Sequence, residues 1–372
     1  MKGAIVGLNQ PPAASAVAKR SPAVAAPNQT GGSPIRFVLP RHLEAGGPPE
    51  RRGLRRDHVR LMVLDRRGGG VVHTRFDRIG SYLRPGDLLV FNDSRTIPAL
   101  LPGLTSRGTV IEVRLARRLG DAGWEALLLP HGGDHTGERI AFRAGLSATV
   151  TGRREDAPWL WRLCFDTSGT ELLDGIYRAG EPIRYNYVPA GVPIDEYQTV
   201  YAAEPGSVEM PSAGRPFSWE VLLELRRRGV QTAFITLHTG LSSFRDDQID
   251  ALRVGHEETY RLTRAAADAV NNARAHGGRV IAVGTTVVRA LETVADAGGH
   301  VHASAGATRL YISASHQLRA VDGLLTGLHE PEASHLDMLS AFVRPDLLAS
   351  AYEQALSTGY LWHEFGDVNL IV

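Results

Sequence analysis

The residues best suited to chemistry follow two apolar segments that the sequence predicts as strands. Residues 231–237 lead into His238-Thr239-Gly240, and residues 280–283 lead into Gly284-Thr285-Thr286. An imidazole can take up or release a proton near neutral pH, and the free N–H groups at a helix start bind anions. Ligands of open α/β sheets bind beyond the carboxyl ends of the strands. Both loops are therefore candidates for one ligand site.

Each loop also has a plainer interpretation. The segment Gly284-Thr285-Thr286 is far less specific than a complete dinucleotide or phosphate-loop fingerprint, so it is also typical of an ordinary strand-to-helix turn, with a threonine as the N-cap. His238 can equally be a structural hydrogen-bonding residue at the end of its strand. Local sequence alone leaves these alternatives open.

Further polar candidates lie downstream. His256 and Glu258 precede Tyr260 at the start of a segment, residues 257–276, that we expect to be one long helix. An acidic residue there also serves simply to complement the helix dipole. Asp322 and His329 complete the set of residues that could transfer protons or orient an imidazole. His131 and His135 are four residues apart, but they lie in glycine-rich sequence, and we expect no metal site.

The elements that position these residues fall into four segments. Residues 1–34, rich in Ala, Pro, Ser and Gly, are expected to form a flexible leader. Residues 61–166 alternate short strands with turns, which predicts an antiparallel β-barrel or sandwich. The expected strands are residues 61–65, 71–76, 88–92, 110–116, 124–129, 139–143, 148–153 and 161–165. Residues 35–60 and 167–372 are assigned to an α/β lobe, because strands and longer helices alternate after about residue 180. The expected fold is mixed α/β, with an antiparallel β-barrel lobe set against a larger α/β lobe that carries the site.

Composition limits the class of protein. The 372 residues are 43% hydrophobic and 22% charged, as in globular chains, and no apolar run is long enough for a membrane span or a secretory signal, so we expect a cytoplasmic protein. Cys164 is the only cysteine, which excludes an internal disulfide and a cysteine-ligated cluster. The net charge of +1 gives no reason by itself to expect a nucleic-acid partner. All basic residues except Lys2 and Lys19 are arginine, which suits phosphate contacts but also follows from codon bias.

An ordered series of short motifs resembles the S-adenosylmethionine:tRNA ribosyltransferase-isomerase family from about Phe37 to Val372. No single motif is decisive, but their order is specific. The series comprises residues 83–95 (LRPGDLLVFNDSR), 97–99 (IPA), 197–202 (YQTVYA), 206–208 (GSV), 211–214 (PSAG), 238–240 (HTG), 256–260 (HEETY), 282–286 (AVGTT), 322–326 (DGLLT), 329–331 (HEP) and 366–367 (GD).

The resemblance implies a step of queuosine formation. The ribosyl part of S-adenosylmethionine is transferred to 7-aminomethyl-7-deazaguanine at the wobble position of tRNA, and adenine and methionine leave. In the mechanism proposed for the family, a base removes a proton from the carbon beside the sulfonium, the ribose opens, and an epoxide closes as methionine departs. Because the sulfonium itself acidifies that carbon, a positioned base suffices and no metal is expected. The anticodon stem-loop of tRNA is then the expected partner.

The resemblance also suggests residue roles. His238 and His256 are the base and acid candidates, and Glu258 or Asp322 would orient an imidazole or hold a ribose hydroxyl, with His329 as a further catalytic candidate. Thr285, Thr286 and the amides around Gly284 would hold the methionine carboxylate or the ribose. The remaining expected cofactor-binding residues are Ser212, Gly214, Phe217, Thr239, Gly240 and Arg289.

The chain departs from the family pattern inside several motifs. Pro216 stands where the family has a histidine, Gly327 where it has an asparagine, and Glu330 where it has a leucine. Leu241 replaces an alanine in the motif that begins with His238. A proline side chain cannot shuttle a proton. The altered loops leave three alternatives: the tRNA enzyme, a relative that cleaves S-adenosylmethionine with a small-molecule acceptor or none, and a non-catalytic RNA-binding protein.

Overall fold

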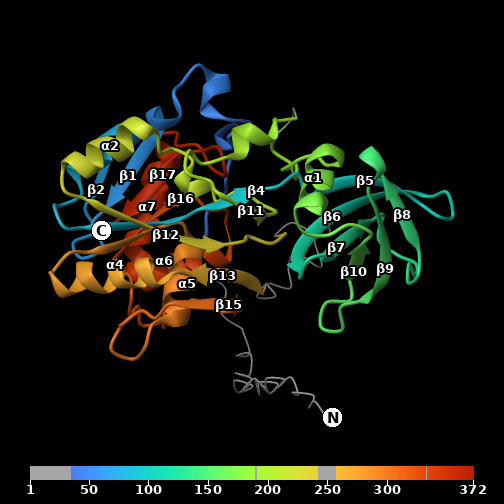
Figure 1. The fold of residues 1–372 in the computed structure, drawn as a ribbon. Coiled ribbons are helices and arrows are strands. Elements are labelled where there is room, and N and C mark those ends of the chain that lie inside the picture. The colour runs from blue at the N-terminus through green and yellow to red at the C-terminus, as the bar shows by residue number, and fades with distance from the viewer. Residues whose placement is uncertain (1–34, 189–190, 242–256, 332) are drawn as a thin grey trace, which may run out of the picture. The chain divides into compact units, whose positions relative to one another are not determined.

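The computed structural model describes residues 35–188, 191–241, 257–331 and 333–372, which form a nine-stranded sheet and a closed barrel (Figure 1). The strand order of the large sheet is β15-β13-β12-β3-β14-β16-β17-β1-β2. The bounds of these strands are β1 (Arg60–Leu64), β2 (Val71–Arg75), β3 (Leu88–Asn92), β12 (Gln231–Leu237), β13 (Glu258–Leu262), β14 (Val280–Val283), β15 (Ser304–Thr308), β16 (Gly323–Gly327) and β17 (Val368–Ile371).

Four central strands, β12, β3, β14 and β16, run parallel. Their side chains alternate between two apolar cores: Leu88 and Val90 face one, while Leu89 and Phe91 face the other. Burial on both faces explains why β3 and β14 read as nearly continuous apolar runs. The helices are α1 (Gly169–Ala179), α2 (Trp219–Arg227), α4 (Arg264–Ala275), α5 (Thr285–Val294), α6 (Ser334–Phe342) and α7 (Pro345–Ser357).

Helices cover both faces of the sheet. Buried side chains of α4, α5, α6 and α7 pack against the face that carries Leu88 and Val90. Helix α2 and the 3-10 helix η4 (Phe76–Ser81) pack against the face that carries Leu89 and Phe91. No described helix combines the length and the apolar character that a membrane span requires.

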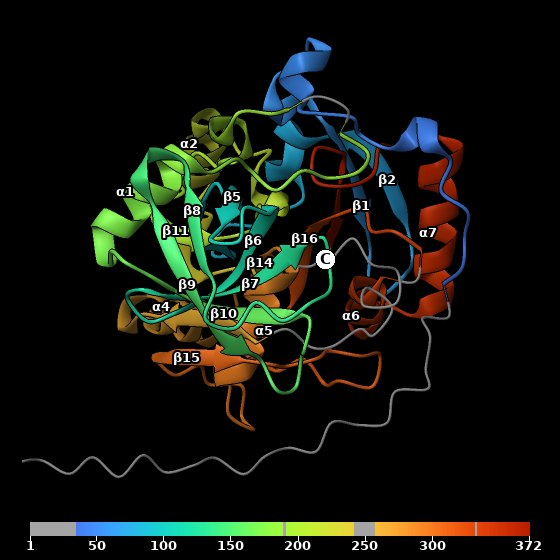
Figure 2. The same cartoon turned by 90° about the vertical axis from the view of Figure 1, so that its right-hand side faces the viewer.

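The barrel consists of β10-β7-β6-β5-β8-β9 and faces the reader in Figure 2. Its strands are β5 (Leu100–Thr105), β6 (Val110–Leu119), β7 (Gly123–Leu129), β8 (Arg139–Phe142), β9 (Ser147–Arg153) and β10 (Leu160–Phe165). Neighbouring strands pair antiparallel, and α1 adds Leu172 and Ile176 to the barrel core. The predicted barrel and α/β lobe are both confirmed as architectures.

The prediction that the barrel begins at residue 61 is wrong. β1, β2 and β3 lie in the large sheet, and β1 pairs with β17 at the other end of the chain. Short strands separated by turns look alike in either lobe, because strand partners far away in sequence leave no local signal. Strand β5, which lies between β6 and β8 in the barrel, was not predicted. The leader predicted for residues 1–34 lies outside the described residues.

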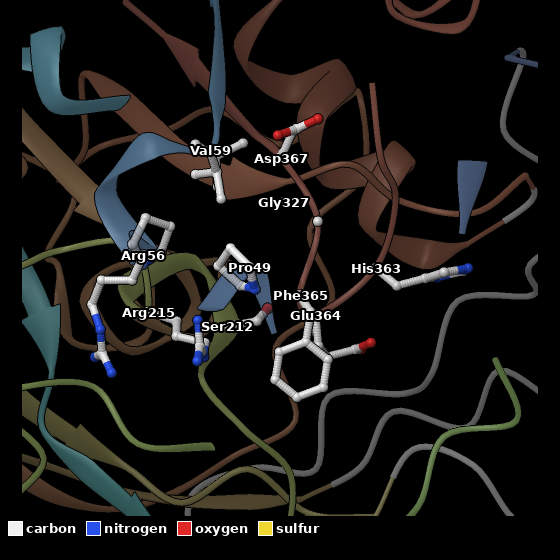
Figure 3. A pocket seen from close by; sticks show the side chains of 13 residues that line it. Pro49, Arg56, Val59, Ser212, Arg215, Gly327, His363, Glu364, Phe365 and Asp367 are labelled. Atoms are coloured by element: carbon white, nitrogen blue, oxygen red, sulfur yellow. The ribbon is translucent and has the colours of Figure 1, made fainter. Parts of the chain in front are cut away.

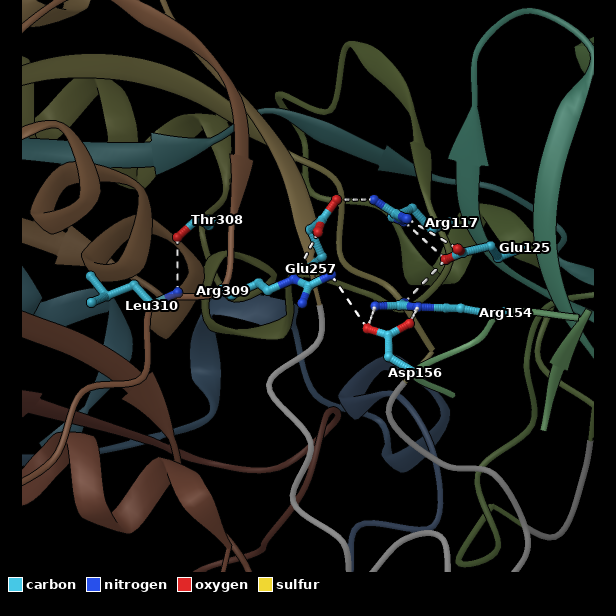
Figure 4. A network of polar contacts seen from close by, with 8 residues as sticks. All are labelled: Arg117, Glu125, Arg154, Asp156, Glu257, Thr308, Arg309 and Leu310. Carbon is cyan, nitrogen blue, oxygen red and sulfur yellow. Dashed lines mark hydrogen bonds and ion pairs between the residues drawn. The ribbon is translucent and has the colours of Figure 1, made fainter. Parts of the chain in front are cut away.

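A charged network joins residues of the barrel to residues at the edge of the sheet (Figure 4). Glu257, which precedes β13, contacts Arg117 of β6 and accepts from Arg309 Nε at 2.7 Å. Arg117 also pairs with the buried Glu125 of β7 at 2.9 Å. Arg309 lies 3.5 Å from Asp156. Ion pairs of this kind hold neighbouring elements in register and weaken with salt.

Candidate active site

The carboxyl ends of β3, β12, β14 and β16 meet at one edge of the sheet, because these strands are parallel neighbours. Asn92 ends β3, His238 follows β12, Gly284 follows β14, and Gly327 ends β16. The edge therefore gathers the two loops that the sequence singled out. It is the position at which α/β sheets bind ligands.

His238 is held in a hydroxyl network. Its Nδ1 lies 2.7 Å from Ser94 Oγ, and Ser94 Oγ lies 2.7 Å from Ser207 Oγ. Ser207 Oγ accepts from the Thr239 amide at 3.1 Å. If Nδ1 carries the proton and donates to Ser94, Nε2 is the nitrogen that can accept a proton. Burial lowers the pKa of His238 to about 4, so the imidazole is neutral at pH 7.

Gly206 explains why the His238 ring fits at this position. Its φ is +159°, and a Cβ added there would lie 2.7 Å from Nδ1 and Cε1 of His238. Contacts that short do not occur between real carbon atoms, so a side chain at 206 would displace the ring. The Gly206-Ser207 pair thus supplies both the space for the imidazole and one hydroxyl of its network.

Asn92 connects the ends of two strands to the start of α5. Its side chain donates to Leu237 O at 2.8 Å and accepts from Leu237 N at 2.9 Å. The same Oδ1 accepts from Ser94 N at 3.1 Å, and Nδ2 reaches Thr286 Oγ1 at 3.5 Å. Asn92, Ser94 and Ser207 were not among the predicted site residues. Asn92 and Ser94 could have been predicted from their position in the sequence, because both lie at the end of a predicted buried strand.

The turn after β14 opens toward this edge. Gly284 is the N-cap of α5, with φ of +98°, and Thr285 is the first helical residue rather than the cap. The first N–H groups of a helix lack partners within it, and the helix dipole makes this end electropositive. Backbone amides and the hydroxyls of Thr285 and Thr286 can therefore bind a carboxylate or sugar hydroxyls.

Glu258 reaches the same region from a strand. The prediction that residues 257–276 form one helix is wrong, because β13 occupies Glu258–Leu262 and α4 begins only after Thr263, whose side chain caps it. Pairing of β13 with β12 and β15 outweighed its local helical pattern. The buried Glu258 contacts Arg289 and accepts from the Gly240 amide at 3.4 Å. Burial raises the pKa of Glu258, while Arg289 opposes that rise.

His329 lies near the end of β16. Its Nε2 is 2.8 Å from Thr326 Oγ1, and its ring stacks on that of His335 with centroids 4.4 Å apart. Burial lowers its pKa well below the ordinary value, so it too is neutral at pH 7. His256 falls outside the described residues.

Two predicted residues do not join the cluster. Asp322 precedes β16 and accepts from Val280 N at 2.9 Å, at the start of β14. It therefore lies at the opposite edge of the sheet from Gly284, since a four-residue strand spans about 13 Å. Phe217 is fully buried, with its ring 4.9 Å from that of Phe91. Its ring packs in that core, and a contact of Phe217 with the cofactor stays a prediction.

The 3-10 helix η7 (Ser212–Gly214) packs beside α5. A Cβ on Gly284 would lie 3.6 Å from Ala213, and a Cβ on Gly214 would overlap Tyr201 OH at 1.9 Å. The absence of a side chain at Gly214 thus permits close packing against Tyr201. Ser212 lines a pocket together with Gly327 and Pro216 (Figure 3). Among residues 35–188, 191–241, 257–331 and 333–372, no three His, Cys, Asp or Glu side chains are grouped as a metal site would require.

Comparisons with known proteins give one consistent result. The family model described as "Queuosine biosynthesis protein" matches residues 33–371. The S-adenosylmethionine:tRNA ribosyltransferase-isomerase of Caldanaerobacter subterraneus is 40% identical over 341 residues, which cover 90% of this chain and 98% of the relative. The enzyme of the same name from Thermus thermophilus is 39% identical over 327 residues, covering 85% and 93%.

A solved structure is also similar. The crystal structure of S-adenosylmethionine tRNA ribosyltransferase from Thermotoga maritima, at 2.00 Å resolution, superposes with a TM-score of 0.53 and is 31% identical. The match covers 91% of this chain and 99% of that chain, so it extends over both the barrel and the sheet.

Proposed function

The chain belongs to the queuosine biosynthesis protein family, and on that premise we propose that it is an S-adenosylmethionine:tRNA ribosyltransferase-isomerase. It transfers and isomerises the ribosyl moiety of S-adenosylmethionine onto 7-aminomethyl-7-deazaguanine in tRNA, giving epoxyqueuosine, adenine and methionine. The observation that carries this proposal is the match over nearly the whole length of relatives bearing that name. Because tRNA is the substrate of this reaction, we propose a cytoplasmic location for the protein.

The strand-end residues can supply the chemistry. A C–H bond beside a sulfonium is acidic, so one positioned base can start the reaction. We assign that role to His238, whose neutral imidazole can accept a proton through Nε2 while Nδ1 donates to Ser94. The proton moves from carbon to Nε2, and the electron pair stays on the carbon beside sulfur. Adenine and methionine are the groups that leave.

The start of α5 is assigned to the cofactor. Its unpaired amides, with Thr285 and Thr286, would bind the methionine carboxylate or ribose hydroxyls. Arg289, one turn further along α5, contacts the buried Glu258, and this pair fixes β13 against the helix. Glu258 and Arg289 would therefore position the His238 loop through Gly240 rather than contact the reacting atoms.

The RNA partner is proposed to be the anticodon stem-loop, which displays the wobble base in an unpaired loop. Unpaired bases are the usual targets of sequence-specific RNA recognition, because they can leave the stack and enter a pocket. Arginine, which makes up nearly all the basic residues of this chain, suits the accompanying phosphate contacts.

Mass spectrometry tests this function. Purified protein is incubated with S-adenosylmethionine, with and without a stem-loop RNA that carries 7-aminomethyl-7-deazaguanine at the wobble position. We expect adenine and methionine in equal amounts only when that RNA is present, and an epoxycyclopentyl adduct on the base. His238→Gln should retain S-adenosylmethionine binding and lose turnover by about 100-fold or more. Adenine and methionine release without RNA, and no adduct when it is supplied, would contradict the tRNA acceptor.

A further inference from the structure

Helix α2 presents a tryptophan to solvent. Trp219, the first residue of α2, is 58% exposed, although tryptophan is highly buried on average. The other four tryptophans, at residues 124, 159, 161 and 362, are buried or half-buried. Leu223 is also exposed, at 50%. It lies on the same face of the helix as Trp219, because residues four apart are neighbours on a helix surface. This face of α2 is therefore apolar and in contact with solvent.

The opposite face of α2 fixes the helix on the sheet. Val221 and Leu225 pack into the core that the sheet shares with α2. Ser218 caps the first turn, because its hydroxyl accepts from Val221 N at 3.2 Å and donates to the buried Asp57 at 2.7 Å. The exposed side chain of Trp219 therefore belongs to a capped and packed turn rather than to a frayed helix end.

The exposed face continues to a cationic residue. Arg226 lies seven residues after Trp219, which is almost two turns, so both point to nearly the same side of the helix. Arg226 is exposed, and no acidic side chain in the described part of the chain pairs with it. Glu224 pairs instead with Arg227 at 3.7 Å and with Arg228 at 2.9 Å. Trp219, Leu223 and Arg226 together form what we call the α2 stripe.

The acidic residue next to the α2 stripe has a cationic partner. Glu220 follows Trp219 and is exposed, and Arg55 lies 3.4 Å from its carboxylate. The α2 stripe itself contains no acidic residue. An anionic polymer that lies along the stripe therefore meets an apolar surface and an unpaired guanidinium.

The α2 stripe begins toward the edge of the sheet that carries the candidate active site. Phe217, just before α2, packs its ring 4.9 Å from that of Phe91, near the carboxyl end of β3. After the helix, Gly229 O accepts from Gly86 N at 2.9 Å, just before β3 begins, and the chain then enters β12 (Figure 1). Helix α2 thus runs antiparallel to β3, and its first turn is the end nearer to the candidate active site.

An exposed aromatic ring followed by a guanidinium suits single-stranded nucleic acid. An aromatic ring stacks on an unpaired base, and arginine binds phosphates of the same strand. Trp219 and Arg226 are about 10 Å apart along the helix axis, a distance that a few nucleotides span. A protein partner fits less well, because a stable protein interface buries about 800 Å² on each partner, far more than two exposed side chains offer.

We propose that the α2 stripe binds the RNA acceptor outside the active site, with Trp219 stacked on an unpaired base and Arg226 in contact with a phosphate of the same strand. Leu223 lies between these two contacts. The inference rests on the proposed function, because it names a surface for the RNA substrate of that reaction. S-Adenosylmethionine is assigned to the strand ends and does not contact the stripe.

Tryptophan fluorescence and RNA affinity test this surface. A stem-loop RNA with 7-aminomethyl-7-deazaguanine at the wobble position is titrated into the unaltered protein, Trp219→Phe, Trp219→Ala and Arg226→Gln. Tryptophan emission reports stacking on the exposed ring, and the anisotropy of a dye on the RNA gives the dissociation constant. Arg319→Gln is the matched control, because Arg319 is exposed and its amide donates to Glu292 of α5, which covers the other face of the sheet. S-Adenosylmethionine affinity, measured by calorimetry, shows that each variant is folded.

We expect the RNA to quench the emission of the unaltered protein and of Arg319→Gln, and Trp219→Phe to remove most of this quenching. Trp219→Ala should raise the dissociation constant of the RNA about 10-fold, whereas Trp219→Phe should keep it within about 3-fold, because a phenyl ring still stacks. Arg226→Gln should lower the slope of log affinity against log salt concentration by about 0.7, the loss of one phosphate contact, and Arg319→Gln should not. S-Adenosylmethionine affinity should be unchanged in every variant.

An unchanged dissociation constant in Trp219→Ala, or undiminished quenching in Trp219→Phe, overturns the inference and leaves the proposed function standing. A change of molar mass in Trp219→Ala by light scattering, with RNA affinity unchanged, overturns it as well and assigns the α2 stripe to contact between copies of the chain. Failure of the unaltered protein to bind or turn over the RNA would instead reject the proposed function.

Discussion

The protonation of His238 gives a quantitative prediction about stability. Its pKa in the folded protein lies near 4, below the ordinary 6.5, because burial disfavours the imidazolium. The unfolded chain therefore binds the proton more tightly than the folded chain does. Stability from this group is complete above pH 6.5 and is lost as the pH falls from 6.5 toward 4. Between about pH 7.5 and pH 5.5, linkage gives a loss of about 1 kcal/mol from His238 alone.

Urea unfolding at the two pH values measures this loss. The unaltered protein should lose about 1 kcal/mol more unfolding free energy on acidification than His238→Gln does, because glutamine does not titrate. His42→Gln, at an exposed position, controls for the replacement itself. Equal losses in the unaltered protein and His238→Gln would refute the assignment of a neutral, desolvated imidazole at the end of β12.

Three further predictions follow from the contacts described above. Gly206→Ala should lower turnover by about 10-fold or more by displacing the His238 ring, whereas Gly152→Ala, at a similar φ with open space around it, should not; steady-state kinetics of both variants decides this. Asp322→Asn should have a kcat within about 3-fold of that of the unaltered protein, because residue 322 lies at the opposite edge of the sheet from the active site. A loss of kcat of about 100-fold would show that Asp322 takes part in the reaction. Glu257→Gln should lower the unfolding free energy by about 1 kcal/mol at low salt and by less in about 0.5 M NaCl, measured by urea unfolding; an effect independent of salt would show that the network acts by packing rather than charge.

The parts of the fold that the sequence predicts well are those with a local cause. The strands at 88–92, 231–237 and 280–283 have the predicted bounds. Residues 88–92 and 280–283 are compact apolar runs buried on both faces, and polar or glycine residues follow all three strands. No local feature of the sequence determines which sheet a strand joins. β1 pairs with β17, about 300 residues later, so nothing near Leu61 distinguishes a barrel strand from a strand of the large sheet.

The same difference between local and long-range causes holds for the candidate site. His238 and Thr285 were predicted because each directly follows a recognisable strand. Ser94 and Ser207 were missed, since their role depends on a contact across 113 residues that brings both hydroxyls to the imidazole. Glu258 was predicted as a site residue but on a helix, because the pairing of β13 with its neighbours overrides local propensity.

We propose that S-adenosylmethionine binds beyond the carboxyl ends of β12 and β14. A crystal structure of the protein with S-adenosylhomocysteine, which lacks the reactive sulfonium, tests it most directly. We expect the amino acid carboxylate at the first turn of α5, near Thr285 and Thr286, and the sulfur-linked carbon of the ribose within reach of His238 Nε2. A ligand bound in the pocket that Ser212, Pro216 and Gly327 line, or on the barrel, with the first turn of α5 empty, would show that this placement is wrong.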